Sequence, residues 1–269
     1  MALSPHMNVM IRAAEKAARS LVRDFGEVEQ LQVSRKGPGD FVSAADHRSE
    51  EIIFEELSKA RPDYAFLMEE RGKGGSADAE FRWIVDPLDG TTNFLHGIPH
   101  WNITIALEQK GEIIAGIVHD PVKNETFRAE KGLGAFMRNK RLRVSGRTSL
   151  EQAVIFTGAP RRSRAQQDLF MLEYEAVQTA CPGMRRFGSA ALDLAYVAAG
   201  RCEAFWERNL NPWDCAAGSI IIREAGGLIA DISTPENPVF TGNILAANSA
   251  LFGELKKLLN EAGQGKNAA

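Results

Sequence analysis

Two aspartates, Asp86 and Asp89, stand three residues apart in the stretch WIVDPLDGTTNF, with a proline between them. In an extended chain these positions would be about 10 Å apart, whereas a turn would bring them within about 7 Å. Pro-x-Asp-Gly is common turn chemistry, so a tight bend at the end of a strand is one interpretation. Two carboxylates about 4 Å apart would also repel each other by about 4 kcal/mol at an effective dielectric constant of about 20, so they would need cations or shared protons.

Further acids stand where predicted strands or loops end, namely Asp46, Glu69, Glu70 and Asp214. Each has a local interpretation when taken singly: Asp46 and Asp214 as helix N-caps, and the two glutamates as a solvated loop edge. Taken together with the aspartate pair, they favour a shared site, because the ends of neighbouring elements commonly build sites on a layered scaffold. Carboxylate oxygens without adjacent His or Cys suit Mg²⁺ or Mn²⁺ better than zinc. Four carboxylates can hold two such ions, about 3.5–4 Å apart in two-metal phosphoryl-transfer sites.

The sequence Gly90-Thr91-Thr92 follows the aspartate pair directly. If it opens a short helix, its backbone N–H groups point outward as donors for an anion, and Gly90 lets the backbone approach that anion closely. The threonine hydroxyls could orient a water. The pattern predicts carboxylates for metal followed by a cradle for phosphate.

These residues lie in motifs that resemble a known family. WIVDPLDGTTNF looks like the first signature of the inositol monophosphatase family, and NPWDCAAGSIIIREAGG looks like its second signature. KGPGDFVSAAD, FLMEE and FGSAALDLAYVAAG are similar to family blocks in the same order, so the resemblance runs from about residue 8 to residue 262. RRFGSAALDLAYVAAGR most resembles the bacterial extragenic-suppressor type. Ser43 stands where many relatives have threonine, a departure that touches no catalytic position.

The resemblance implies two or three Mg²⁺ ions per subunit, for which Mn²⁺ would be a substitute. Glu69, Asp86 and the carbonyl of Leu88 would hold the first ion. Asp86, Asp89 and Asp214 would hold the second, which makes Asp86 the bridging ligand. Such ions would lower the pKa of a bound water and stabilise both the attacking and the leaving oxygen.

The resemblance also implies roles for the neighbouring residues. Thr91, hydrogen-bonded to Asp46, would activate the attacking water together with Glu69, and the N–H groups of Gly90 and Thr91 would bind the phosphate. The hydroxyls of a sugar or inositol would face Asp89, Gly188, Ser189, Ala190, Glu207 and Asp214, with Arg185 as a further pocket residue. No cysteine or serine nucleophile is required, and Cys215 is interpreted as a buried helix thiol.

The fold implied by the resemblance is α/β (α+β), a layered α/β/α/β/α sandwich of the inositol monophosphatase and fructose-bisphosphatase-like type. Relatives are usually dimeric, and lithium inhibits many of them by occupying a metal site. We therefore expect a homodimer that is sensitive to lithium.

Apolar spacing predicts a helix over residues 8–24, then a Gly/Pro loop, and a second helix that Ser43 or Asp46 caps and that reaches Lys59. Residues 64–70 are predicted as a buried strand, 71–80 as an exposed loop, and 81–86 as a strand that ends at Asp86. Four strand-like segments between residues 102 and 145 predict an antiparallel meander. KGLGAF, at 131–136, is interpreted as a hairpin turn rather than a phosphate loop.

A composition shift near residues 145–150 divides the chain. Residues 1–145 are predicted as an N-terminal α+β half with most of the metal ligands, and 146–269 as an α/β half with the substrate pocket, the two forming one compact catalytic unit. The second half is predicted to contain strands at 153–158, 202–207, 227–232 and 244–248, and helices at 165–180, from 189, at 214–225 and at 251–259. Residues 263–269 read as a frayed tail.

Composition excludes several classes of protein. The net charge of −3 and dispersed basic residues give no footprint for nucleic acid, and no apolar run reaches the roughly 20 residues that span a bilayer. The N-terminal segment lacks the apolar core of a secretory signal. The three cysteines, Cys181, Cys202 and Cys215, lack C-x-x-C spacing, which favours reduced thiols and a cytoplasmic protein.

The remaining polar and aromatic features have structural interpretations. The five histidines show no ligand spacing, although His96 or His100 is expected to act indirectly beside the site. The basic segments 138–143 and 160–164 are interpreted as solvated edges. Trp206 and Trp213 are expected to pack rather than to stack on substrate.

The predicted function is Mg²⁺-dependent hydrolysis of a small polyol or sugar monophosphate, with myo-inositol 1-phosphate as the leading substrate. Fructose 1,6-bisphosphate, histidinol phosphate and a nucleotide 3′-phosphate are alternatives on the same fold. Glu207 favours a neutral polyol, since its charge would repel a second phosphate. A different hypothesis follows from the suppressor-type resemblance: a regulatory binding protein associated with RNA polymerase and ribosomal RNA transcription. No direct nucleic-acid contact and no membrane contact are expected.

Overall fold

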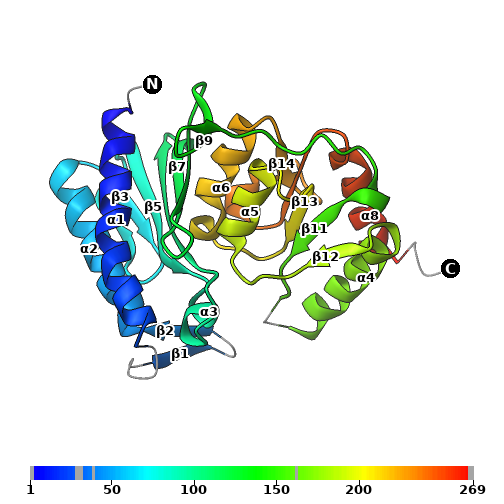
Figure 1. The fold of residues 1–269 in the computed structure, drawn as a ribbon, viewed down its shortest axis with the longest axis horizontal. Coiled ribbons are helices and arrows are strands. Elements are labelled where there is room, and N and C mark those ends of the chain that lie inside the picture. The colour runs from blue at the N-terminus through cyan, green and yellow to red at the C-terminus, as the bar shows by residue number, and fades with distance from the viewer. Residues whose placement is uncertain (1–2, 28–32, 38–39, 161–162, 266–269) are drawn as a thin grey trace.

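Helices and β-sheets alternate in five layers in this computed structural model, which describes residues 3–27, 33–37, 40–160 and 163–265 (Figure 1). The order of layers is α1 and α2, a large sheet, α5 and α6, a small sheet, and finally α4 and α8. This arrangement confirms the predicted layered α/β/α/β/α sandwich.

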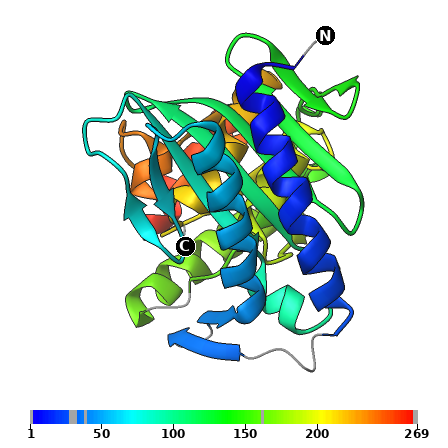
Figure 2. The same ribbon diagram turned by 90° about the vertical axis from the view of Figure 1, so that its left-hand side faces the viewer.

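The first layer consists of α1 (Pro5–Phe25) and α2 (Ala44–Ala60), which lie side by side across one face of the large sheet (Figure 2). The Ser4 hydroxyl caps α1 by accepting a 3.0 Å hydrogen bond from the Met7 backbone N–H. Alanines at positions 13, 14 and 17 line the buried face of α1. Their small side chains let α2 pack closely. Ser43 begins α2, as predicted, and a short hairpin of β1 (Val33–Gly37) and β2 (Asp40–Ser43) precedes it.

The large sheet has eight strands among the described residues, in the order β10-β9-β8-β7-β6-β5-β3-β4. Its strands are β3 (Ala65–Met68), β4 (Gly72–Gly74), β5 (Phe81–Asp89), β6 (Asn102–Gln109), β7 (Glu112–Asp120), β8 (Glu125–Glu130), β9 (Gly134–Met137) and β10 (Lys140–Arg141). From β5 to β10 every neighbouring pair is antiparallel, which confirms the predicted meander, whereas β3 pairs with β5 in parallel. A five-residue helix, α3 (Thr91–Leu95), follows β5.

The middle layer consists of α5 (Ala190–Ala198) and α6 (Pro212–Glu224). Both helices are buried almost throughout, because α6 packs against β5 to β9 and α5 against the small sheet. Apolar residues around the whole circumference are the expected composition for helices held between two sheets. Cys215 lies buried in α6, as predicted, and none of the three cysteines forms a disulfide.

The small sheet has five strands among the described residues, in the order β12-β11-β13-β15-β14. They are β11 (Val154–Thr157), β12 (Gly183–Arg185), β13 (Ala204–Glu207), β14 (Leu228–Asp231) and β15 (Ile244–Ala247). On its outer face α4 (Arg164–Ala180) packs against α8 (Phe252–Gly263). The short elements η2 (Leu150–Gln152) and α7 (Pro238–Thr241) complete the described chain.

Several element predictions were wrong in detail. The strand expected to stop at Asp86 continues to Asp89, and the loops expected at 36–50 and 71–80 contain β2 and β4. Strand β12 and helix α7 were not predicted, because three or four residues are too short to show a periodicity. Residues 38–39 of the Gly/Pro loop, 161–162 of the second basic segment and 266–269 of the tail lie outside the described residues.

Other expectations are confirmed. The predicted hairpin turn at 131–136 joins β8 to β9 through residues 131–133, and residues 134–136 already belong to β9. Arg138, Lys140 and Arg141 are exposed, as a solvated edge requires. Trp206 is buried, and Trp213 packs against the core between the sheets. The division into halves at residue 145 stays a prediction.

Candidate active site

The first signature lies at the end of β5, where the strand is irregular. Asp86 pairs with Thr104 of β6 and Asp89 with Asn102, and the register shifts between these two pairs. The backbone N–H of Leu88 donates a 2.9 Å hydrogen bond to Oδ1 of Asp86, which closes a local turn over Pro87. The predicted turn therefore exists and lies within the strand rather than beyond it.

Asp89 is held from three sides by hydrogen bonds to its Oδ2 atom. The amide of Asn102 donates at 2.8 Å, the hydroxyl of Ser189 at 2.6 Å and the backbone N–H of Ala191 at 3.0 Å. Ala191 lies in the first turn of α5, where a negative charge is stabilised by unpaired backbone N–H groups. These bonds fix the orientation of the Asp89 carboxylate and join it to the second half of the chain.

Asp214 and Asp46 occupy equivalent positions at the starts of two helices. Oδ2 of Asp214 accepts a 2.7 Å hydrogen bond from the backbone N–H of Asn211, and Oδ2 of Asp46 accepts a 2.8 Å bond from that of Ser43. Each aspartate is thus the third helical residue of a capping box, with Asn211 or Ser43 as the N-cap. The prediction that these aspartates are N-caps was wrong by three positions.

The hydroxyl of Thr91 connects Asp46, in the first turn of α2, with Leu88 near the end of β5. Its hydroxyl lies 3.1 Å from Oδ1 of Asp46 and 3.0 Å from the carbonyl oxygen of Leu88. Gly90 precedes it with φ +91°, and a Cβ there would lie 3.0 Å from the carbonyl oxygen of His100. Glycine is therefore needed for the chain to turn from β5 into α3.

Burial and mutual repulsion raise the pKa values of the clustered carboxyls. Burial raises the pKa of Asp86 well above its usual range, and the charges of Glu69, Asp89 and Asp214 raise it further. Burial and the charge of Asp89 likewise raise the pKa of Asp214 well above its usual range. Burial raises the pKa of Asp89 and of Asp46, and hydrogen bonds to each carboxylate oppose that shift.

Glu69 and Glu70 follow β3, which lies beside β5 in the sheet, and both are half-buried rather than a solvated edge. The backbone N–H of Glu69 donates a 3.3 Å hydrogen bond to the carbonyl of Val85. The backbone N–H of Glu70 donates a 2.9 Å bond to the buried carboxylate of Glu50. The parallel pairing of β3 with β5 thus brings Glu69 near Asp86.

The donor set of this cluster suits a hard cation. Among the described residues, no three His, Cys, Asp or Glu side chains are arranged so that they could hold a metal ion as they stand. The charges of Asp89 and Asp214 nevertheless raise the pKa of Asp86, and the charge of Asp89 raises that of Asp214. Among the described residues, none of these three carboxylates forms an ion pair with a basic side chain. Buried carboxylates of this kind need a proton or a cation, and oxygen ligands of this type fit Mg²⁺.

The residues predicted to face the substrate lie on two elements of the second half. Gly188, with φ +81°, leads into Ser189 and Ala190 at the start of α5, and both of these are buried. Glu207 ends β13, and a Cβ on Gly158 would lie 2.0 Å from its carboxylate. The Glu207 carboxylate therefore occupies the space above the backbone of Gly158.

Arg185 is exposed, and its guanidinium donates a 2.7 Å hydrogen bond to the carbonyl of its neighbour Met184. Within the described ranges, Arg185 forms no hydrogen bond or ion pair with the other site residues. The substrate role of Ser189 stays a prediction. Its hydroxyl hydrogen-bonds with Asp89 and Asn102, so Ser189 also orients the Asp89 carboxylate.

Three buried polar residues beside the site were not predicted. Asn102 donates to both Asp89 and Ser189, Asn93 donates to the carbonyls of the 187–188 segment, and the hydroxyl of Ser49 donates to the carbonyl of Pro87 at 2.8 Å. Asn93 lies inside the first signature, so its position in the sequence could have indicated that it belongs to the site. The partners of Asn102 and Ser49 are distant in sequence, so no local pattern indicates them.

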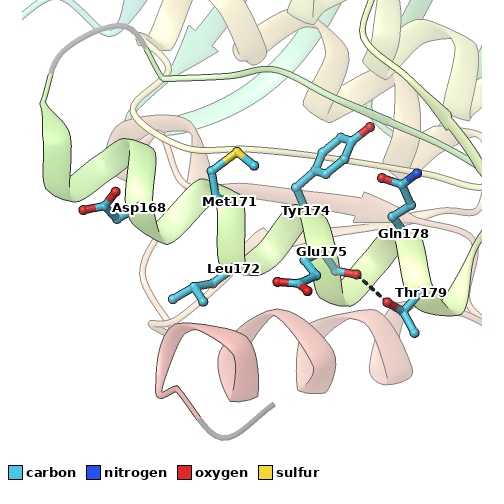
Figure 3. A pocket seen from close by; sticks show the side chains of 7 residues that line it. All are labelled: Asp168, Met171, Leu172, Tyr174, Glu175, Gln178 and Thr179. Atoms are coloured by element: carbon cyan, nitrogen blue, oxygen red, sulfur yellow. Dashed lines mark hydrogen bonds between the residues drawn. The ribbon is translucent and has the colours of Figure 1, made fainter. Parts of the chain in front are cut away.

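A hollow of the described surface lies away from these residues. About 640 Å³ in volume, it runs along the exposed face of α4, where Met171, Leu172 and Tyr174 lie together with Gln178 (Figure 3). A second hollow of about 390 Å³ lies between α4 and α8. Neither contains a predicted site residue, so the carboxylate cluster is identified by its buried charge rather than by its volume.

Comparison with known proteins agrees with this geometry. The model of the inositol monophosphatase family matches residues 2–264. The chain belongs to the inositol monophosphatase family. Its members are metal-dependent phosphatases, and the chain contains the signature acids at the positions described above. The structure contains no helix long and apolar enough to cross a membrane in its described part.

Similar proteins of this family carry two kinds of name. An "Inositol-1-monophosphatase" of Mesorhizobium japonicum is 53% identical over 97% of this chain and 98% of its own length. A "Nus factor SuhB" of Pseudomonas aeruginosa is 41% identical over 93% of this chain and 94% of its own. The crystal structure of the extragenic suppressor protein suhB from Bartonella henselae superposes with a TM-score of 0.92 at 52% identity, covering 96% and 99% of the two chains.

Proposed function

We propose that this protein hydrolyses myo-inositol 1-phosphate, or a closely related polyol monophosphate, with Mg²⁺ as its cofactor. The observation that carries the proposal is the placement of the Thr91 hydroxyl between Asp46 and the Leu88 carbonyl, beside the carboxyls of Asp86, Asp89 and Asp214, which form no ion pair with a basic residue of the described ranges. The name of the Mesorhizobium relative supports the choice of substrate.

Two or three divalent ions would be held by Glu69, Asp86, Asp89, Asp214 and the carbonyl of Leu88. When bound, they would activate a water and neutralise charge on the phosphoryl oxygens. The burial of Asp86 and the three bonds that orient Asp89 keep these ligands in place without help from solvent.

Thr91 and Asp46 would act as a pair on the attacking water. The Asp46 carboxylate accepts the Thr91 hydroxyl proton in a hydrogen bond, which leaves the Thr91 oxygen lone pairs available to accept from a water. The backbone N–H groups of Gly90 and Thr91, at the start of α3, would bind the phosphate oxygens. Fixed donors of this kind stabilise charge that develops in the transition state.

At the other end of the substrate, Glu207 and the Gly188–Ala190 segment would face the hydroxyls. A carboxylate accepts hydrogen bonds from a neutral polyol and repels a second phosphate. This preference favours a monophosphate over fructose 1,6-bisphosphate. Homodimer formation, inhibition by lithium and a cytoplasmic location belong to the same proposal.

The test is phosphate release from myo-inositol 1-phosphate and from fructose 1,6-bisphosphate, measured side by side with and without Mg²⁺. Mg²⁺-dependent turnover that favours the inositol ester is the expected result. Preference for the bisphosphate would overturn the role of Glu207 and keep the metal mechanism. Release from neither ester would reject the proposed reaction.

A second function rests on a separate observation, the 41% identity to a protein named Nus factor SuhB. Under it, the chain would bind a component of the transcription machinery such as RNA polymerase. Pull-down from extract with the wild-type chain and with Asp86→Asn tests it. Retention of the same partner by both proteins would support binding independent of catalysis, whereas loss of every specific partner at moderate salt would reject it.

A further inference from the structure

The side-chain amide of Asn93 bridges segments that are distant in the chain. It donates hydrogen bonds of 2.8 Å to the carbonyl of His100 and 2.8 Å to that of Phe187, and lies 3.5 Å from the carbonyl of Gly188. Asn93 belongs to α3, immediately after the Gly90–Thr92 cradle, and its side chain is 8% exposed. One buried amide thus links the proposed phosphate end of the site to the segment that enters α5.

The start of α5 is also held by the hydrogen bonds of Ser189 and Ala191 to Asp89, so the amide of Asn93 acts on the residues just before this helix, 187 and 188. Gly188 adopts φ +81°, a conformation that other residues rarely take, and Phe187 is 39% exposed. The Phe187 ring lies 5.1 Å from that of His100 and 5.0 Å from that of Phe156. Aromatic contacts of this type are weakly directional compared with buried hydrogen bonds, so they leave the backbone carbonyls at 187 and 188 unfixed.

We propose that Asn93 is a positioning residue that sets polyol selectivity by fixing residues 187 and 188 against the phosphate end of the site. The inference rests on the proposed function and deepens it. Removal of the amide would leave the carbonyls of His100 and Phe187 without their donor, which costs free energy and loosens the segment. The bond between Thr91 and Asp46 does not involve Asn93 and would persist.

The test compares two substrates in Asn93→Ala and in the wild type. Myo-inositol 1-phosphate uses both ends of the site, whereas 4-nitrophenyl phosphate presents a phosphate without a polyol. We expect kcat/KM for the inositol ester to fall by about tenfold, mainly through KM, and that for the aryl ester to change by less than about twofold. Asn93→Asp, which keeps the size and removes the donors, should act in the same direction if the alanine variant folds poorly.

Hydrogen exchange provides a readout that is independent of catalysis. Exchange in a peptide covering residues 183–192 should become faster in Asn93→Ala. The matched control is Asn260→Ala, because the amide of Asn260 also bridges two carbonyls, those of Ile232 and Lys256 at 2.8 Å each, and lies in α8 away from the site. That variant should leave both the substrate ratio and exchange at 183–192 unchanged.

Three outcomes would overturn the inference: equal losses for both substrates, unchanged exchange at 183–192 in Asn93→Ala, or the same changes in Asn260→Ala. Failure of the proposed function is a separate result. If the wild type hydrolyses the aryl ester and ignores the inositol ester, the substrate assignment is wrong, and the exchange comparison still decides whether Asn93 holds the segment.

Discussion

The hydroxyl of Ser189 donates a 2.6 Å hydrogen bond to Oδ2 of Asp89, one hundred residues earlier in the chain. Asn102 donates to both of these residues, so a buried polar network connects the end of the large sheet with the start of α5. The proposed metal ligand Asp89 therefore depends on the contact between the large sheet and α5. A site built across such a contact loses its geometry when either element shifts.

Asp86→Asn should abolish activity and stabilise the protein in the absence of metal. Burial and three neighbouring carboxyls all raise the pKa of Asp86. We expect kcat/KM to fall at least about 100-fold. Removing the buried charge should raise the unfolding free energy without Mg²⁺ by about 1–3 kcal/mol.

Denaturant unfolding with and without Mg²⁺, together with phosphate release, measures both effects. Exposed Asp63→Asn is the control and should change neither. Full activity of Asp86→Asn at saturating Mg²⁺ would contradict the proposed role of Asp86.

Thr91→Val should lower kcat by about 100-fold, because the variant keeps the shape and lacks the hydroxyl that Asp46 and the Leu88 carbonyl hold. Thr91→Ser retains the hydroxyl and should recover most of the rate. Steady-state kinetics with myo-inositol 1-phosphate checks the pair. Equal losses in both variants would show that the hydroxyl alone does not account for the rate, which contradicts its assigned role.

Glu207→Gln should lower kcat/KM for myo-inositol 1-phosphate by about tenfold and narrow the preference over fructose 1,6-bisphosphate, since a charged acceptor becomes a neutral one. Gly158→Ala should act similarly, because its Cβ would enter the space of the Glu207 carboxylate. Initial rates on both esters give the ratio. If the ratio of the rates on the two esters is unchanged in both variants, Glu207 does not contribute to substrate selection.

His100 should make stability depend on pH below neutrality. Burial, followed by the charge of Lys123, lowers the pKa of His100 from 6.5 to about 4. Between these values the unfolded chain binds a proton that the folded protein does not, so the stabilising contribution is complete above pH 6.5 and is lost as the pH falls toward 4.

In His100→Phe, which keeps an aromatic ring beside Phe187, the loss of unfolding free energy between about pH 7.5 and about pH 4.5 should be smaller by about 2–3 kcal/mol than in the wild type. Urea unfolding at the two pH values measures it. Exposed His47→Phe should keep the wild-type difference. An identical pH dependence in His100→Phe and the wild type would contradict the assignment.

The sequence alone determined the features that depend on neighbours along the chain. The turn between Asp86 and Asp89, the glycine before the short helix at Thr91 and the apolar periodicity of α1 are local features that the structure confirms, whereas the metal role of the two aspartates stays a prediction. The layered fold followed from motifs that resemble a family, and the structure confirms it. Very short elements such as β4 and β12 were not predicted, because strand pairing rather than intrinsic preference stabilises them.

Only the tertiary structure decided which polar groups meet. The sequence does not indicate that Asn102 and Ser189 orient Asp89, or that Asn93 reaches the carbonyl of Phe187, 94 residues away. Such contacts depend on how sheets and helices stack, and burial then makes each unpaired donor or acceptor costly. Local spacing thus indicated which residues are proposed to bind metal and phosphate, and the packing of sheets and helices determined how those residues are held.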